Sequence, residues 1–255
     1  MSKLNELFEI YPGDASATMP LGVRANDLVY AGGLAGTDPV TGAPTGDLLA
    51  QTETALKHLA AAVEGAGGST DNIGRAVAFV TRAEDRMAVY DPWDAMFPDA
   101  NDRPAFKVLV ADLPPGQLVR IDGLAILGAR RMRGEIPGVS ARDPSVRLGD
   151  WLFTSRVHGI HPEDGVPSDV RTEAVQNFEN LSDLLDIHGF EPSDMVQITI
   201  FGNDSTYFEI ARQACEQVFL AVGGDPAIEC VASPLAPKFK ISAEMIAVKG
   251  GAPDF

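Results

Sequence analysis

The chain has 255 residues, of which 45% are hydrophobic and 22% charged, a composition typical of globular proteins. Its 20 basic and 36 acidic residues give a formal charge of −16, which repels phosphate backbones, so we expect no nucleic-acid partner. Its apolar runs are far shorter than the roughly 20 residues of a membrane span, and no signal-peptide pattern opens the chain. We therefore expect a cytoplasmic protein without membrane contact.

The first half shows a regular succession of patterns. An alternating stretch precedes an Asp-Pro-x-x-Gly turn, as in a β-hairpin, and apolar residues at helical spacing then predict an amphipathic helix that ends at a glycine. The predicted elements are, in chain order, a strand over 27–31, a helix over 48–65, a strand over 76–81, a helix over 85–96, and strands over 106–111 and 118–127. Residues 129–140 form the predicted linker, and we interpret the basic run from Arg130 to Arg133 as solvated.

The second half repeats the first. Residues 23–30 recur at 146–153, and from Leu59 with Leu181 to Ala125 with Ala247 the offset is constant at 122. A register held this long indicates an internal duplication. The corresponding elements are strands over 150–154, 197–201, 228–232 and 239–248, and helices over 170–188 and 206–222. We predict an α+β fold, a tandem repeat of two ββαβαββ domains over residues 1–130 and 131–255.

Several short motifs accompany this order of elements. They are the Asp-Pro-x-Thr-Gly turn at 38–42, Gln-Thr-x-x-Ala-Leu at 51–56, Ala-Gly-Gly at 66–68, and an Arg-Pro-Ala … Ile-Asp-x-Leu-Ala ending over 103–125. Together they resemble the Rid family, also called the L-PSP endoribonuclease family, over nearly all of 15–128 and, less closely, 139–250. The resemblance implies chorismate-mutase-like domains, trimeric packing and ligand clefts between neighbouring domains. For two-domain chains we expect a homo-oligomer of three chains.

The resemblance also implies a pair of site residues. Family members hold a substrate carboxylate with an arginine and orient the attacking water with an acid near the chain end, chemistry that a guanidinium fork and a positioned carboxylate can perform. The acid falls on Asp122 and, 122 residues later, on Glu244. Each carboxylate interrupts an apolar strand, so it is either a functional group in a cleft or a group on a solvated face.

The family arginine is absent from both halves. In the first half Phe106 takes its place, which leaves Lys107 or Arg103 as the cation. In the second half Arg156, which follows Ser155, is the available cation, although it could equally be an ordinary surface residue. Tyr90 stands where the family has an asparagine and is either a ligand contact or a packing residue.

We expect an enzyme, a hydrolase that adds water to an imine, enamine or related conjugated carboxylic acid, without a cofactor or metal. A chorismatase-like hydrolase or lyase acting on a cyclic enol acid is the alternative within enzymes. A non-catalytic protein that binds or senses a small ligand is the other alternative, because both arginine positions are altered. The expected partner is a small-molecule carboxylate.

Overall fold

The computed structural model describes residues 7–10, 20–139 and 142–251. The chain divides into two compact units, and the boundary lies between Met132 and Arg133. No helix among the described residues combines the length and apolarity that a membrane crossing needs.

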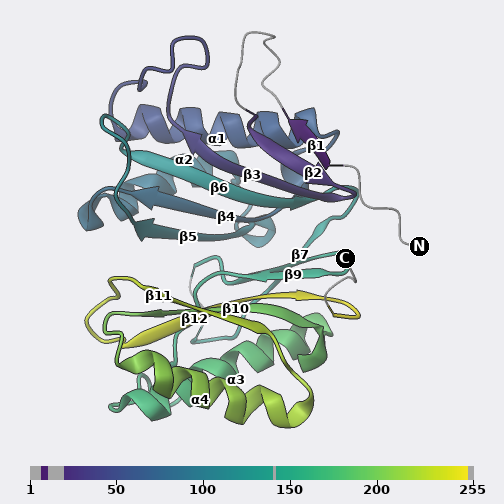
Figure 1. Ribbon diagram of the computed structural model, residues 1–255, viewed down its shortest axis with the longest axis vertical. Coiled ribbons are helices and arrows are strands. Elements are labelled where there is room, and N and C mark those ends of the chain that lie inside the picture. Colours follow the sequence, from purple (N-terminus) through teal and green to yellow (C-terminus); the bar gives the residue numbers. More distant parts are fainter. Residues whose placement is uncertain (1–6, 11–19, 140–141, 252–255) are drawn as a thin grey trace. The chain divides into compact units, whose positions relative to one another are not determined.

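The first unit is a six-stranded sheet with helices on one face (Figure 1). Its strands are β1 (Leu7–Ile10), β2 (Gly22–Ala25), β3 (Leu28–Ala35), β4 (Ile73–Val80), β5 (Ala105–Val110) and β6 (Val119–Ile126), and its helices are α1 (Leu48–Gly65) and α2 (Tyr90–Met96). The strands lie in the order β1-β2-β3-β6-β4-β5, antiparallel except for the parallel pair β4 and β5.

The second unit has the same architecture. Its sheet consists of β7 (Arg131–Gly134), which spans the boundary between the units, and of β8 (Ser145–Leu148), β9 (Trp151–Thr154), β10 (Met195–Gly202), β11 (Ala227–Ala232) and β12 (Ile241–Val248). Its helices are α3 (Val170–His188) and α4 (Tyr207–Phe219). The strands lie in the order β7-β8-β9-β12-β10-β11, which is the order of the first sheet with six added to each strand number. The predicted duplication and the ββαβαββ order are therefore confirmed, with one further strand at the start of each unit.

The duplication extends to buried polar contacts. Near the start of α1, the buried Gln51 side chain accepts a hydrogen bond from the backbone N–H of Leu118 at 2.8 Å. At the equivalent place in α3, the buried Glu173 carboxylate accepts one from Lys240 N–H, also at 2.8 Å. Each contact ties the start of the long helix to the segment that leads into the last strand of its unit.

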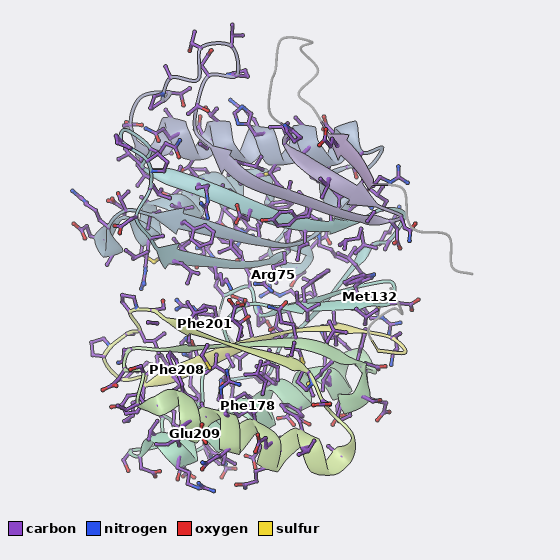
Figure 2. The ribbon with its side chains drawn as sticks, in the orientation of Figure 1. Arg75, Met132, Phe178, Phe201, Phe208 and Glu209 are labelled. Atoms are coloured by element: carbon purple, nitrogen blue, oxygen red, sulfur yellow. The ribbon has the colours of Figure 1, made fainter. Side chains whose placement is uncertain are left out.

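Each sheet buries one face against its helices. In the first unit Ile121, Ala76 and Phe106 belong to a core that includes the apolar side of α1. In the second unit Met245 and Ile198 pack with Phe178 of α3, which lies between the sheet and its helices in Figure 2. Because side chains alternate across a strand, the residues between these core positions point to the face without helices. We call it the helix-free face.

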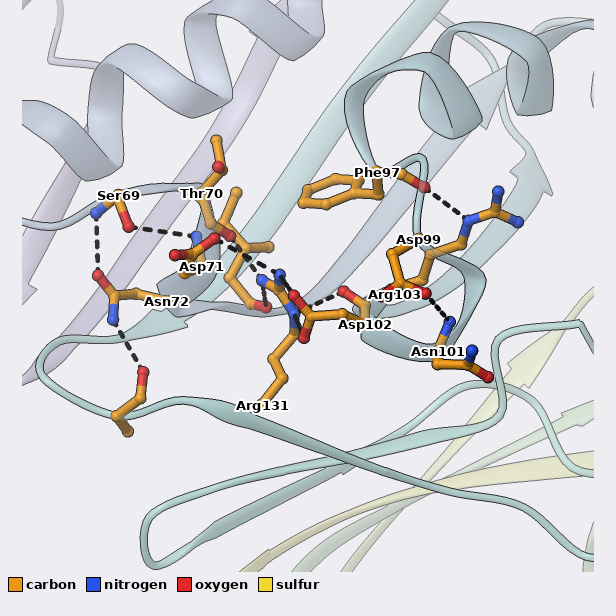
Figure 3. Close-up of polar contacts among 12 residues, drawn as sticks. Ser69, Thr70, Asp71, Asn72, Phe97, Asp99, Asn101, Asp102, Arg103 and Arg131 are labelled. Carbon is orange, nitrogen blue, oxygen red and sulfur yellow. Dashed lines mark hydrogen bonds and ion pairs between the residues drawn. The ribbon is translucent and has the colours of Figure 1, made fainter.

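The predicted linker is partly wrong, because β7 lies inside it and its basic run is not simply solvated. The Arg131 side chain is only 3% exposed. It donates to both carboxylate oxygens of Asp102, at 3.0 and 2.8 Å, and to the carbonyls of Thr70 at 2.6 Å and Ile73 at 3.2 Å (Figure 3). Arg133 is also paired, at 3.1 Å from the buried carboxylate of Asp143.

Two further local predictions need correction. The helix expected over 85–96 is a 3-10 helix over Ala83–Val89, followed by the short α2. A continuous α-helix would place Pro92 in its interior, where proline clashes with the preceding turn, whereas in α2 it lies in the first turn. The turn at 38–42 does not join two long strands either, since only one bridge, between Thr37 and Pro44, closes its loop.

Candidate functional site

A row of side chains crosses the helix-free face of the first sheet. Asp122 on β6 is paired with Val77 on β4, and Val77 is paired with Lys107 on β5. Paired residues project to the same face, so these three side chains lie side by side across three strands. The structure thus brings together the predicted acid and one predicted cation, with an apolar residue between them.

A β-bulge in β3 holds the Asp122 carboxylate. The register between β3 and β6 shifts between Ala31 and Leu34, so that the pair Gly32 and Gly33 lies beside Asp122. Gly33 has a φ of 72°, a conformation that glycine adopts at little cost, and its N–H donates to Asp122 Oδ1 at 2.7 Å. No hydrogen bond to Oδ2 is found among the described residues, so this oxygen can face a ligand or water.

Arg120 lies next to this carboxylate. It is two residues from Asp122 on β6, and its Nε lies 3.7 Å from Asp122 Oδ1, too far for a hydrogen bond. Its guanidinium carbon lies 4.7 Å from the centre of the Phe79 ring, a cation–π distance. Phe79 and Arg120 are also a cross-strand pair between β4 and β6. The ring supports the guanidinium while 37% of the arginine side chain remains exposed.

Tyr30 is a further group on this face. A Cβ atom on Gly32 would come within 2.5 Å of the Tyr30 hydroxyl oxygen, so the ring lies over the bulge, where only glycine leaves room for it. Burial and then the nearby Asp122 carboxylate raise the pKa of Tyr30. Its phenol is therefore neutral at pH 7 and available as a hydrogen-bond donor.

The second sheet has the equivalent row with different chemistry. Glu244 on β12 is paired with Thr199 on β10, and Thr199 is paired with Glu229 on β11. Glu244 is 2% exposed, whereas Glu229 is exposed. The second sheet therefore has two acids and a hydroxyl where the first has an acid, a valine and a lysine.

Ser155 and Arg156 follow β9 at the positions that correspond to Gly32 and Gly33. The backbone returns to β12 one residue later, where Val157 bridges to Ala243. Arg156 has no positive φ, so it does not reproduce the glycine bulge. Its guanidinium carbon lies 5.5 Å from the centre of the Phe201 ring. Phe201 lies on the side of its sheet away from α3 and α4 (Figure 2).

The charge of Arg156 also acts on His158. Burial, and then the positive charge of Arg156, lower the pKa of His158 to about 4. Its ring stacks on Phe239 at a centroid distance of 3.8 Å. His158 is therefore neutral at pH 7.

Two predicted binding residues lie elsewhere. Arg103 donates to the carbonyl of Phe97 at 2.8 Å and pairs with Asp94 at 3.1 Å, both near the end of α2 (Figure 3). Tyr90 packs edge-on against Phe106 within the helix-side core. Phe106 alternates with Lys107 along β5, so the structure does not bring Arg103 or Tyr90 to the face of Asp122.

The described residues contain no group of three or more His, Cys, Asp or Glu side chains that could hold a metal ion. The two helix-free faces offer carboxylates that accept protons, together with cations and hydroxyl groups, which suit an uncharged electrophile attached to a carboxylate.

The sequence prediction missed Arg120, Gly33 and Tyr30. Arg120 could have been found, since a strand places residues two apart on one face. The pair Gly32-Gly33 within a strand also indicates a bulge. Tyr30 could not have been found without the fold, because only the pairing of β3 with β6 brings it near Asp122.

The comparisons with known proteins agree with the two-domain organisation of the chain. The family model described as endoribonuclease L-PSP matches the chain twice, over residues 14–127 and 141–249. A 2-iminobutanoate/2-iminopropanoate deaminase of Escherichia coli K12 is 33% identical over 107 residues, which are 41% of this chain and 84% of that protein. A RutC family protein of Pasteurella multocida is 32% identical over 109 residues, which are again 41% of this chain and 84% of that protein.

Among solved structures, that of Escherichia coli TdcF with bound serine has 28% sequence identity and a TM-score of 0.41, covering 46% of this chain and 91% of that one. Each of these relatives therefore corresponds to less than half of the present chain.

Proposed function

We propose that this chain, which belongs to the endoribonuclease L-PSP (Rid) family through both of its halves, hydrolyses small imines or enamines that carry a carboxylate. The observation that carries the proposal is the placement of an acid at equivalent positions of the two helix-free faces, Asp122 and Glu244. The similarity to a 2-iminobutanoate/2-iminopropanoate deaminase supports the choice of an imine.

The reaction needs one water and one proton acceptor. The carboxylate of Glu244 or Asp122 takes a proton from water as the water oxygen bonds to the imine carbon. The proton then passes to nitrogen, which gives a carbinolamine. The same carboxylate next takes the hydroxyl proton of the carbinolamine and gives it to nitrogen as the C=O bond forms and the carbon–nitrogen bond breaks, and the products are a ketone and ammonia. An imine and water contain all the atoms of these products, so no cofactor is required.

The cations of the two faces hold the substrate carboxylate in this proposal. Lys107 serves in the first domain and Arg156, with Ser155 beside it, in the second. Arg103 and Tyr90 act at most indirectly, because both are engaged at α2.

The test is turnover of 2-iminobutanoate generated in the cuvette by an amino acid oxidase, with ammonia release measured above the uncatalysed rate. Glu244→Gln keeps the shape but cannot accept a proton, so it should lower turnover by roughly 10² or more with the fold intact. Asp122→Asn should lower turnover less, because the shorter aspartate reaches less far. The control is Glu216→Gln, which removes an exposed carboxylate on α4. Full activity of Glu244→Gln would show that the acid is assigned wrongly.

A further inference from the structure

Each domain has a phenylalanine at the same position of the repeat, and in each a guanidinium lies over its ring. Phe79 on β4 and Phe201 on β10 are equivalent in the repeat, 122 residues apart. The guanidinium carbon of Arg120 lies 4.7 Å from the Phe79 ring centre, and that of Arg156 lies 5.5 Å from the Phe201 ring centre. Each phenylalanine is also close to the acid of its own face. Phe79 is two residues from Val77, the cross-strand partner of Asp122. Phe201 is two residues from Thr199, the cross-strand partner of Glu244.

The two arginines, however, come from different strands. Arg120 is on the last strand of the first domain, where the second domain has Ser242. Arg156 follows β9, where the first domain has Gly33. Each domain thus lacks an arginine at the position that the other uses. Both nevertheless place a guanidinium on the equivalent phenylalanine ring, beside the acid of that face.

The state of Arg120 favours a binding role. Asp122 is too distant for a hydrogen bond to it, and the Arg120 Nε atom, although shielded from solvent, has no hydrogen-bond partner among the described residues. A guanidinium held by a ring, with its donors not saturated, is prepared to bind a planar anion through two N–H groups. Val77 and Phe79 form an apolar floor beside it, suited to a short aliphatic chain.

We propose that Arg120 and Arg156 are equivalent carboxylate-binding residues, so that each domain carries its own site for a small 2-imino or 2-oxo monocarboxylate. The inference rests on the proposed function for the choice of ligand. It adds Arg120 to Lys107 as a cation of the helix-free face of the first domain.

The experiment counts binding sites with 2-oxobutanoate, the ketone that hydrolysis of 2-iminobutanoate would leave. Equilibrium dialysis of the full chain with labelled 2-oxobutanoate should give two sites per chain at saturation. Arg120→Ala and Arg156→Ala should each leave one site of unchanged affinity and weaken the other by about 10- to 100-fold, and the double variant should have none of the original affinity. Arg82→Ala, which removes an exposed arginine paired only locally, is the control and should keep both sites.

Arg120→Lys tests the fork, because lysine keeps the charge but loses the paired donors. It should bind with intermediate affinity, and circular dichroism of every variant confirms folding. Two unchanged sites in folded Arg120→Ala would overturn the inference even if the wild-type protein hydrolyses imines. Two sites that respond as expected, in a protein that hydrolyses no imine, would instead remove the proposed function and leave the inference intact.

Discussion

At the scale of single residues, Arg131 has a larger structural role than its place in a run of charges indicates. Its guanidinium satisfies two backbone carbonyls and both oxygens of the Asp102 carboxylate while being almost fully buried. A sequence shows only that three arginines stand close together. Which one is buried depends on how the chain leaves β6, and that path is a property of the fold.

Arg131→Ala should therefore destabilise the first domain by about 2–4 kcal/mol, since it leaves a carboxylate and two carbonyls without their donor. The neighbouring Arg130→Ala is the matched control, because Arg130 is exposed, and it should change stability by less than about 0.5 kcal/mol. The measurement is urea unfolding followed by tryptophan fluorescence. The chain has two tryptophans, so each arginine variant also carries Trp151→Phe, which leaves Trp93 of the first domain as the only fluorescent tryptophan. Equal midpoints for the two arginine variants would contradict this role.

At the scale of elements, the long helices were predictable to the residue and the short elements were not. Helices α1 and α3 have the predicted bounds, because each begins at an aspartate cap and combines a long apolar stripe with a glycine at its end. The strand β7 was missed because four residues carry too little pattern to outweigh their charges. The bulge in β3 was missed for a different reason, since its role appears only once β6 lies beside it.

This bulge makes a sharp test of how the acid is held. Gly33→Ala and Gly42→Ala both place an alanine at a positive φ, 72° and 69°, and neither new Cβ would meet another atom within 4 Å. Each should therefore cost about 1–2 kcal/mol of stability. Only Gly33→Ala should also lower the imine turnover of the first domain, measured in a Glu244→Gln background, because the strain is relieved by moving the N–H that holds Asp122. Similar activity losses in both variants would mean that the bulge has no special role.

At the scale of the whole molecule, the duplication has preserved geometry and changed charge. The row Lys107, Val77, Asp122 of the first sheet corresponds to Glu229, Thr199, Glu244 of the second, so an acid and a hydroxyl stand where the first sheet has a cation and an apolar residue. Two domains with one fold and one acid position can therefore differ in the substrate side chain that they accept. A chain with a single such domain would carry only one version of this row.

The same architecture leads to our prediction of the assembly. Each sheet is covered by helices on one face, while its other face carries apolar side chains such as Phe79 or Phe201 among its charges. Among the described strands, β5 and β11 each end a sheet with one side unpaired, which invites pairing or covering by another chain. The resemblance to the Rid family implies a ring of three domains. Three two-domain chains would supply six domains, enough for two such rings. Sedimentation equilibrium at micromolar concentration should therefore give three times the chain mass of 27.1 kDa. A mass that stays at that of one chain from low to high micromolar concentration would exclude this assembly.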